Sequence, residues 1–109
     1  MATINRLTES LSVAPQLQPE NMAELARAGF KTVINNRPDG ESEDQPTSAE
    51  LAAAAEAAGL EYAHQPVVGN NISDVDIDGF DAIVSLAEQP VLAFCRTGTR
   101  CTTLWALTQ

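Results

Sequence analysis

The sequence predicts a single α/β domain over residues 1–109, built on a small parallel sheet flanked by helices. Three observations lead to this prediction. Strand-like and helix-like segments alternate along the chain. The segment Val91–Phe94 is wholly apolar, which is typical of strands buried in parallel sheets. A length of 109 residues allows one modest hydrophobic core and little more.

The first part of the chain alternates in this way. A short apolar run at 12–15 is a strand candidate. A helix is expected over 20–28, because a proline precedes it, apolar residues recur at helical spacing and a glycine follows. Residues 30–35, FKTVIN, are rich in branched side chains and predict a second strand. The Pro, Gly, Asp and Glu residues of 36–46 predict a loop.

Two capping boxes predict the next helices. Thr47 and Glu50 stand three residues apart before the alanine-rich segment 51–58, and a glycine follows it. Ser73 and Asp76 repeat the pattern before a helix expected to stop near residues 89–90. That helix carries an apolar stripe at helical spacing, formed by Ile77, Phe80, Ile83, Val84 and Ala87.

Between and after these helices lie the remaining elements. Residues 60–68 predict a strand interrupted by Pro66, followed by a turn at 69–71. After the apolar strand 91–94 comes a loop that contains a glycine, and residues 102–107 predict a last helix.

The net charge of the chain makes some classes of binding partner unfavourable. Fifteen acidic and six basic residues give a formal net charge of −9, which disfavours binding to nucleic acid and to membrane surfaces. The longest apolar stretch, 51–58, is interrupted by a glutamate and is far too short to span a membrane. No basic segment followed by an apolar one opens the chain. We therefore expect a soluble, cytoplasmic protein.

The segment CRTGTR, residues 95–100, carries the candidate chemistry. It follows the apolar strand at its carboxyl end, where parallel sheets bind ligands. Backbone N–H groups of Arg96, Thr97, Gly98 and Thr99 can converge on an anion, Gly98 permits the necessary curl, and Arg100 can grip an oxyanion with both nitrogens. The same field favours the thiolate of Cys95, which would then be a nucleophile facing a bound oxyanion.

Simpler interpretations exist for the two cysteines. Cys95 could be a small core residue, although two arginines and a glycine are unexpected neighbours for one. Cys101 has the default interpretation of an inert helix residue, and a resolving or regulatory thiol is the alternative. The cysteines are six apart and His64 is the single histidine, so the sequence predicts no metal site and no cofactor.

Three segments resemble a known family. They are INNRPDGE (34–41), HQPV (64–67) and LAFCRTGTRCTTLWAL (92–107), and they are similar to the phosphatase-like domain of β-lactamase hydrolase-like proteins, also called DUF442. The resemblance covers nearly the whole chain. It implies a protein-tyrosine-phosphatase-like fold and a cysteine-dependent hydrolase, with Cys95 as nucleophile and Arg100 as the oxyanion-binding arginine. It also implies a small oxyanion or phosphorylated substrate and, because some members are fused to one, association with a metallo-β-lactamase-like domain.

The chemistry stays open between three classes. Tyrosine and dual-specificity phosphatases have five residues between Cys and Arg, whereas four separate Cys95 from Arg100. That spacing is similar to the loop of some rhodaneses, so sulfur transfer through a Cys95 persulfide is the alternative to phosphoester hydrolysis. A non-catalytic anion-binding module is the third class. No carboxylate stands at the usual place of the phosphatase general acid, which leaves Asp39 and Asp74 as candidates, unless both are turn or helix-start residues.

The sequence also gives expectations for several further side chains. Arg37 either supplements the anion site or is a solvated loop residue. His64 is expected to be a strand-end residue with a satisfied hydrogen bond rather than a catalyst. Thr99 or Thr102 could donate a hydroxyl hydrogen bond to the thiolate. The acidic residues around 41–44 are expected to form a solvated loop.

Overall fold

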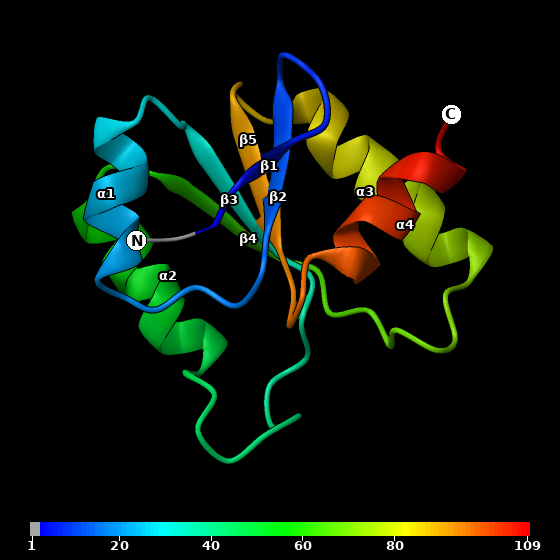
Figure 1. Cartoon of the computed structure of the whole chain (residues 1–109), viewed down its shortest axis with the longest axis horizontal. Helices are drawn as coiled ribbons and strands as arrows, with labels where there is room; N and C mark the ends of the chain where they lie inside the picture. The colour runs from blue at the N-terminus through cyan, green and yellow to red at the C-terminus, as the bar shows by residue number, and fades with distance from the viewer. Residues whose placement is uncertain (1–2) are drawn as a thin grey trace.

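The computed structural model describes residues 3–109, so the first two residues of the predicted domain lie outside it. Five strands form one sheet in the order β1-β2-β5-β3-β4 (Figure 1). Four of them run parallel, as predicted, whereas β1 is antiparallel to β2 and makes the sheet mixed. The strands are β1 (Asn5–Arg6), β2 (Leu11–Ala14), β3 (Thr32–Asn35), β4 (Glu61–His64) and β5 (Val91–Phe94).

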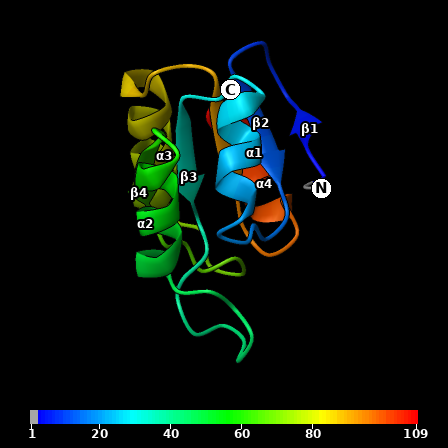
Figure 2. The same cartoon turned by 90° about the vertical axis from the view of Figure 1, so that its left-hand side faces the viewer.

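Helices cover both faces of the sheet, which confirms the predicted layers. The two helices on one face lie opposite the two on the other (Figure 1, Figure 2). The first pair is α1 (Asn21–Arg27) and α2 (Ser48–Ala57), and the second pair is α3 (Asp74–Leu86) and α4 (Thr99–Leu107). No helix among residues 3–109 has the length and apolar character that crossing a bilayer requires.

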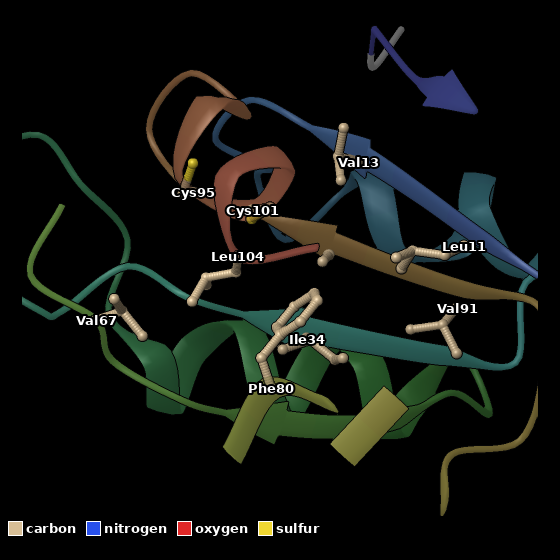
Figure 3. Close-up of a cluster of buried hydrophobic side chains, with 10 residues drawn as sticks. Leu11, Val13, Ile34, Val67, Phe80, Val91, Cys95, Cys101 and Leu104 are labelled. Carbon is tan, nitrogen blue, oxygen red and sulfur yellow. The ribbon is translucent and has the colours of Figure 1, made fainter. Parts of the chain in front are cut away.

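The alternation of side chains along β5 connects the sheet to two apolar clusters. Leu92 and Phe94 point toward α1 and α2, whereas Val91, Ala93 and Cys95 belong to the cluster under α3 and α4 (Figure 3). All five are buried. A strand buried on both faces has no polar side, which is why its sequence is continuously apolar.

Both predicted capping boxes are present. Thr47 accepts from the backbone of Glu50 at the start of α2, and Ser73 accepts from that of Asp76 at the start of α3. Each such cap stabilises its helix by about 1 kcal/mol. Other boundaries differ from the prediction. Helix α4 begins at Thr99 rather than 102, and the strand expected at 60–68 is confined to β4, since the chain leaves the sheet before Pro66.

The register of the sheet positions the candidate site. Ala14, Phe94, Asn35 and His64, the last residues of four neighbouring strands, stand level with one another. The loops that follow β2, β3, β4 and β5 therefore leave the same edge of the sheet. Cys95 lies in this edge, and its N–H is 3.4 Å from the Ala14 oxygen.

Candidate active site

The loop between β5 and α4 curls around the Cys95 sulfur. Gly98 has φ of 89° and lies at the N-terminus of α4, in the left-handed region that favours glycine. In this conformation its N–H donates to Cys95 Sγ at 3.1 Å. The amino end of α4 adds its partial positive charge beside the same sulfur. The curl predicted from the sequence thus encloses the thiol itself.

The surroundings of Cys95 favour the thiolate form of its side chain. Its pKa is lowered to about 5, chiefly because the Cys101 side chain donates a hydrogen bond to it. Burial acts in the opposite direction and raises the pKa of Cys95. The backbone N–H groups of Cys101, Thr97 and Gly98 add further lowering contributions. A pKa in this range favours the charged form of Cys95 at neutral pH.

Cys101, rather than the expected threonine, is the side chain that donates a hydrogen bond to Cys95. Its thiol faces two acceptors, the Cys95 sulfur and the Asn36 side-chain oxygen, which lies 3.2 Å from Cys101 Sγ. A thiolate carries a full charge, so it is the stronger acceptor whenever Cys95 is ionised. The adjacent thiolate and burial both raise the pKa of Cys101, which keeps it protonated. Thr102 instead donates its hydroxyl to the Gly98 oxygen.

We predict that Cys101→Ala raises the pKa of Cys95. A hydrogen bond to a charged acceptor contributes about 1.5–3 kcal/mol, which corresponds to roughly one to two pKa units. Thiolate absorbance in the ultraviolet, measured against pH, reports the change. Cys101→Ser retains a donor and is expected to stay near the wild-type titration. An unchanged midpoint in the alanine variant would remove Cys101 from this role.

Arg100 lies in the first turn of α4, and the hydrogen-bond partners of its guanidinium belong to other segments of the chain. Its nitrogens donate to both Glu41 carboxylate oxygens at 3.2 Å, and Nη1 also donates to the Val67 oxygen at 2.9 Å. The Asn36 oxygen lies 3.4 Å from the same nitrogen. Arg100 therefore joins the loops that follow β3 and β4 to the start of α4.

Arg37 belongs to the same constellation. The residue is buried, and its Nε donates to Glu41 at 2.9 Å while Nη1 donates to the Gln16 side chain at 2.9 Å. This excludes the interpretation of Arg37 as a solvated loop residue. Burial by itself raises the pKa of Glu41, but the hydrogen bonds from Arg100 and Arg37 outweigh it and lower that pKa below its ordinary value.

A cleft of about 550 Å³ opens over these arginines. Arg37, Arg96 and Arg100 are half of the six basic residues of the chain, so the cleft is cationic although the protein is acidic. Gly69 lines it as well, where a Cβ would stand 3.0 Å from Arg100 Nε. The absence of a side chain at Gly69 gives the guanidinium its place. The remaining lining residues are Glu41, Ser42, Val68 and Asn70.

The two candidate acids differ in their surroundings. Asp39 accepts from the Ser48 N–H at 2.8 Å and so fastens the loop to the start of α2. Asp74 is the first residue of α3, is exposed and follows closely on the cleft-lining turn at 69–70. Neither carboxylate lines the cleft among the residues that the structure describes.

The other predicted residues have defined places. Arg96 is exposed at the cleft, and its backbone oxygen accepts from the Gln16 N–H. The Thr97 hydroxyl accepts from the Thr99 N–H at 3.3 Å, which orders the exposed part of the loop. His64 Nε2 is 2.9 Å from the Arg37 oxygen, in agreement with the expected satisfied hydrogen bond. Within residues 3–109 no three His, Cys, Asp or Glu side chains form a metal-ligand group.

Sequence reasoning missed Glu41 and Asn36. Glu41 lies in the acidic segment expected to be a solvated loop, but it holds both Arg37 and Arg100. Asn36 is fully buried, and its amide nitrogen donates to the Gln65 oxygens, so its own oxygen faces Cys101. The motif INNRPDGE contained both residues, but a local motif does not reveal partners that lie about sixty residues away along the chain.

Comparison with known proteins agrees with the motifs. Residues 3–109 match the family of the β-lactamase hydrolase-like protein, phosphatase-like domain. A β-lactamase hydrolase-like protein of Agrobacterium fabrum is 42% identical over 102 residues, which are 94% of this chain and 24% of that protein. The chain thus spans about a quarter of the length of this relative.

Solved structures confirm the predicted fold. A candidate phosphatase from Neisseria meningitidis is 45% identical, with a TM-score of 0.88 over 94% of this chain and 72% of that one. TpbA of P. aeruginosa, solved in complex with phosphotyrosine, shares the fold at 20% identity. Its TM-score is 0.66 over 87% of this chain and 54% of that one.

Proposed function

We propose that this chain, which belongs to the family of phosphatase-like domains of β-lactamase hydrolase-like proteins, is a cysteine-dependent hydrolase of phosphate monoesters. The observation that carries the proposal is the placement of the Cys95 sulfur, which accepts from the Gly98 N–H at 3.1 Å beside the amino end of α4. The thiolate of Cys95 is held by the loop N–H groups and by Cys101, with a pKa of about 5, at the carboxyl edge of a parallel sheet. Such a thiolate is a ready nucleophile at neutral pH.

The reaction would proceed in two steps. Cys95 Sγ attacks phosphorus, a sulfur–phosphorus bond forms, and the bond to the leaving oxygen breaks. The leaving oxygen takes a proton from a general acid and departs as an alcohol or phenol. Water then attacks phosphorus, releases inorganic phosphate and returns the thiolate.

Arginines and backbone amides would stabilise the charge that develops on the phosphoryl oxygens. In this proposal Arg100 turns from Glu41 to grip two equatorial oxygens, and the N–H groups of residues 96–99 complete the cradle. Arg37 and Arg96 line the cleft and add positive charge there. The charge of the cleft favours anionic substrates despite the net charge of −9.

Asp74 is the better-supported general acid of the two candidates. The carboxylate of Asp39 is engaged with the start of α2, whereas Asp74 is exposed next to the turn that lines the cleft. We predict that Asp74→Asn lowers turnover of phenyl phosphate by roughly 10²-fold. Turnover of 4-nitrophenyl phosphate should change little, because its leaving group needs no proton.

Asp39→Asn serves as the matched comparison for this prediction. Asp39→Asn is expected to change the turnover of both substrates by the same factor, since the Asp39 carboxylate fastens a loop to the start of α2 and protonates no leaving group in this proposal. Equal losses for both substrates in Asp74→Asn would contradict the assignment of the acid to Asp74.

Sulfur transfer is the second candidate function. The four-residue spacing between Cys95 and Arg100 favours it, and a low-pKa thiolate serves it equally well. In that reaction Cys95 would take sulfur from thiosulfate, release sulfite and pass the sulfur to an acceptor thiol or cyanide. Parallel assays with phenyl phosphate and with thiosulfate plus cyanide separate the two. Phosphate release without thiocyanate is the result expected of the hydrolase, and the reverse would replace it with a sulfurtransferase.

We also propose a partner domain and a cellular location for this chain. The curated relative is about four times as long as the match, which leaves room for the predicted metallo-β-lactamase-like partner domain. The two unpaired cysteines suit the predicted cytoplasmic location. The proposed hydrolysis requires no metal or other cofactor, since a thiolate, an acid and arginines carry every step.

A further inference from the structure

The Glu41 carboxylate stands at the point where two arginines of the cleft converge. One of its oxygens accepts from Arg37 Nε at 2.9 Å, and the pair of oxygens meets the two terminal nitrogens of Arg100 at 3.2 Å. A carboxylate and a phosphoryl group present similar oxygens to a guanidinium fork. Glu41 therefore occupies the position that an anionic ligand of these arginines would take.

The ion pairs are not ordinary surface contacts. The side chains of Arg37 and Arg100 are 5% and 13% exposed, and that of Glu41 is 28% exposed. Buried guanidinium groups need a charged partner more than exposed ones do. Within residues 3–109, Glu41 is the carboxylate that pairs with each of them, and their other acceptors are neutral oxygens.

The segment that carries Glu41 is suited to release it. Residues 36–47 contain no helix or strand, and the Glu41 backbone is held through a side chain, since its N–H donates to the Gln45 amide oxygen at 3.2 Å. The left-handed Gly40 immediately before it marks a turn. Glu41 can thus leave Arg100 by a movement of this loop, without disturbing the sheet.

We propose that Glu41 is an internal competitor of the substrate: it holds Arg100 in the free protein and yields it to the incoming oxyanion. This inference rests on the proposed function, because it takes the ligand to be a phosphate group at the Cys95 loop. An internal competitor lowers the apparent affinity of every ligand by the fraction of molecules in which the site is open. Removing the competitor tightens binding, which loss of a merely structural contact would not do.

Titration calorimetry with inorganic phosphate tests the proposal on the intact chain. Glu41→Gln is expected to bind phosphate about tenfold more tightly than the wild type, since charge-assisted bonds to Arg100 must otherwise be broken. Glu41→Ala gives a second route to the same result. Glu43→Gln is the matched control, because it removes the same charge from the same loop and should leave the affinity unchanged.

The outcomes separate this inference from the function beneath it. Suppose that the wild type binds phosphate measurably and that both Glu41 variants bind it equally or more weakly. Glu41 is then not a competitor of the substrate, whereas the proposed phosphate site at the Cys95 loop is unaffected. If Glu43→Gln binds phosphate as tightly as Glu41→Gln does, the gain in affinity comes from the change in net charge, and the competitor role of Glu41 is wrong. An absence of phosphate binding in the wild type and in every variant would overturn the proposed function together with the inference.

Discussion

Cys95→Ser is expected to reduce turnover of phenyl phosphate by at least about 10³-fold. A serine hydroxyl has no partner in this loop that would ionise it, because the N–H groups and Cys101 around it are donors. They stabilise an existing negative charge but accept no proton. Steady-state phosphate release by the purified variant measures the effect.

The same substitution separates chemistry from binding. Serine is only slightly smaller than cysteine, so at residue 95 in its buried cluster the substitution leaves little empty space. We therefore expect Cys95→Ser to fold and to bind inorganic phosphate within a few-fold of the wild type. Normal turnover by this variant would remove Cys95 from the reaction.

Arg100→Ala is expected to lower kcat/KM for phenyl phosphate by roughly 10²- to 10³-fold. The guanidinium carries the charge and the two-pronged geometry that the equatorial oxygens require. Its removal also leaves the Val67 oxygen without its donor and Glu41 with Arg37 alone. Steady-state kinetics should show a raised KM together with a lowered kcat.

Two variants control this prediction. Arg100→Lys retains the charge without the fork, so its activity should fall between the wild type and the alanine variant. Arg27→Ala removes an exposed arginine of α1 and should leave kcat/KM unchanged. Equal activity of Arg100→Ala and Arg27→Ala would show that Arg100 does not hold the oxyanion.

The pH dependence of turnover follows from the thiolate. The pKa of Cys95 lies near 5, below the ordinary range of a thiol, so the reactive form accumulates as pH rises through that value. Below it the sulfur is protonated and turnover is lost. Because Cys101→Ala raises this pKa, the acidic limb of its pH–rate profile should move toward neutral pH.

Elements with local signals were predicted well. Capping boxes, each spanning four residues, predict the starts of α2 and α3, and an unbroken apolar run predicts β5. By contrast, β1 consists of Asn5 and Arg6, two exposed polar residues with no strand pattern. Its pairing with β2 depends on the tertiary structure, so its antiparallel direction could not be read from the chain.

The candidate site divides in the same way. Cys95, Gly98 and Arg100 lie within one six-residue segment, so the sequence alone was enough to single them out as candidates. The supporting contacts join distant segments: Glu41 reaches Arg100 across 59 positions, and Asn36 reaches Cys101 across 65. The local sequence around a glutamate in an acidic loop does not indicate that its partner is a distant arginine. These contacts depend on strand register, which brings the ends of β3 and β5 level.

The most direct test of the central claim is intact-protein mass spectrometry after rapid quenching of the reaction with phenyl phosphate. We predict that the wild type gains the mass of one phosphoryl group, that the gain maps to Cys95, and that it is absent in Cys95→Ser. A parallel incubation with thiosulfate should leave the mass unchanged. Gain of a single sulfur atom on Cys95 from thiosulfate, with no phosphoryl adduct from phenyl phosphate, would contradict the account.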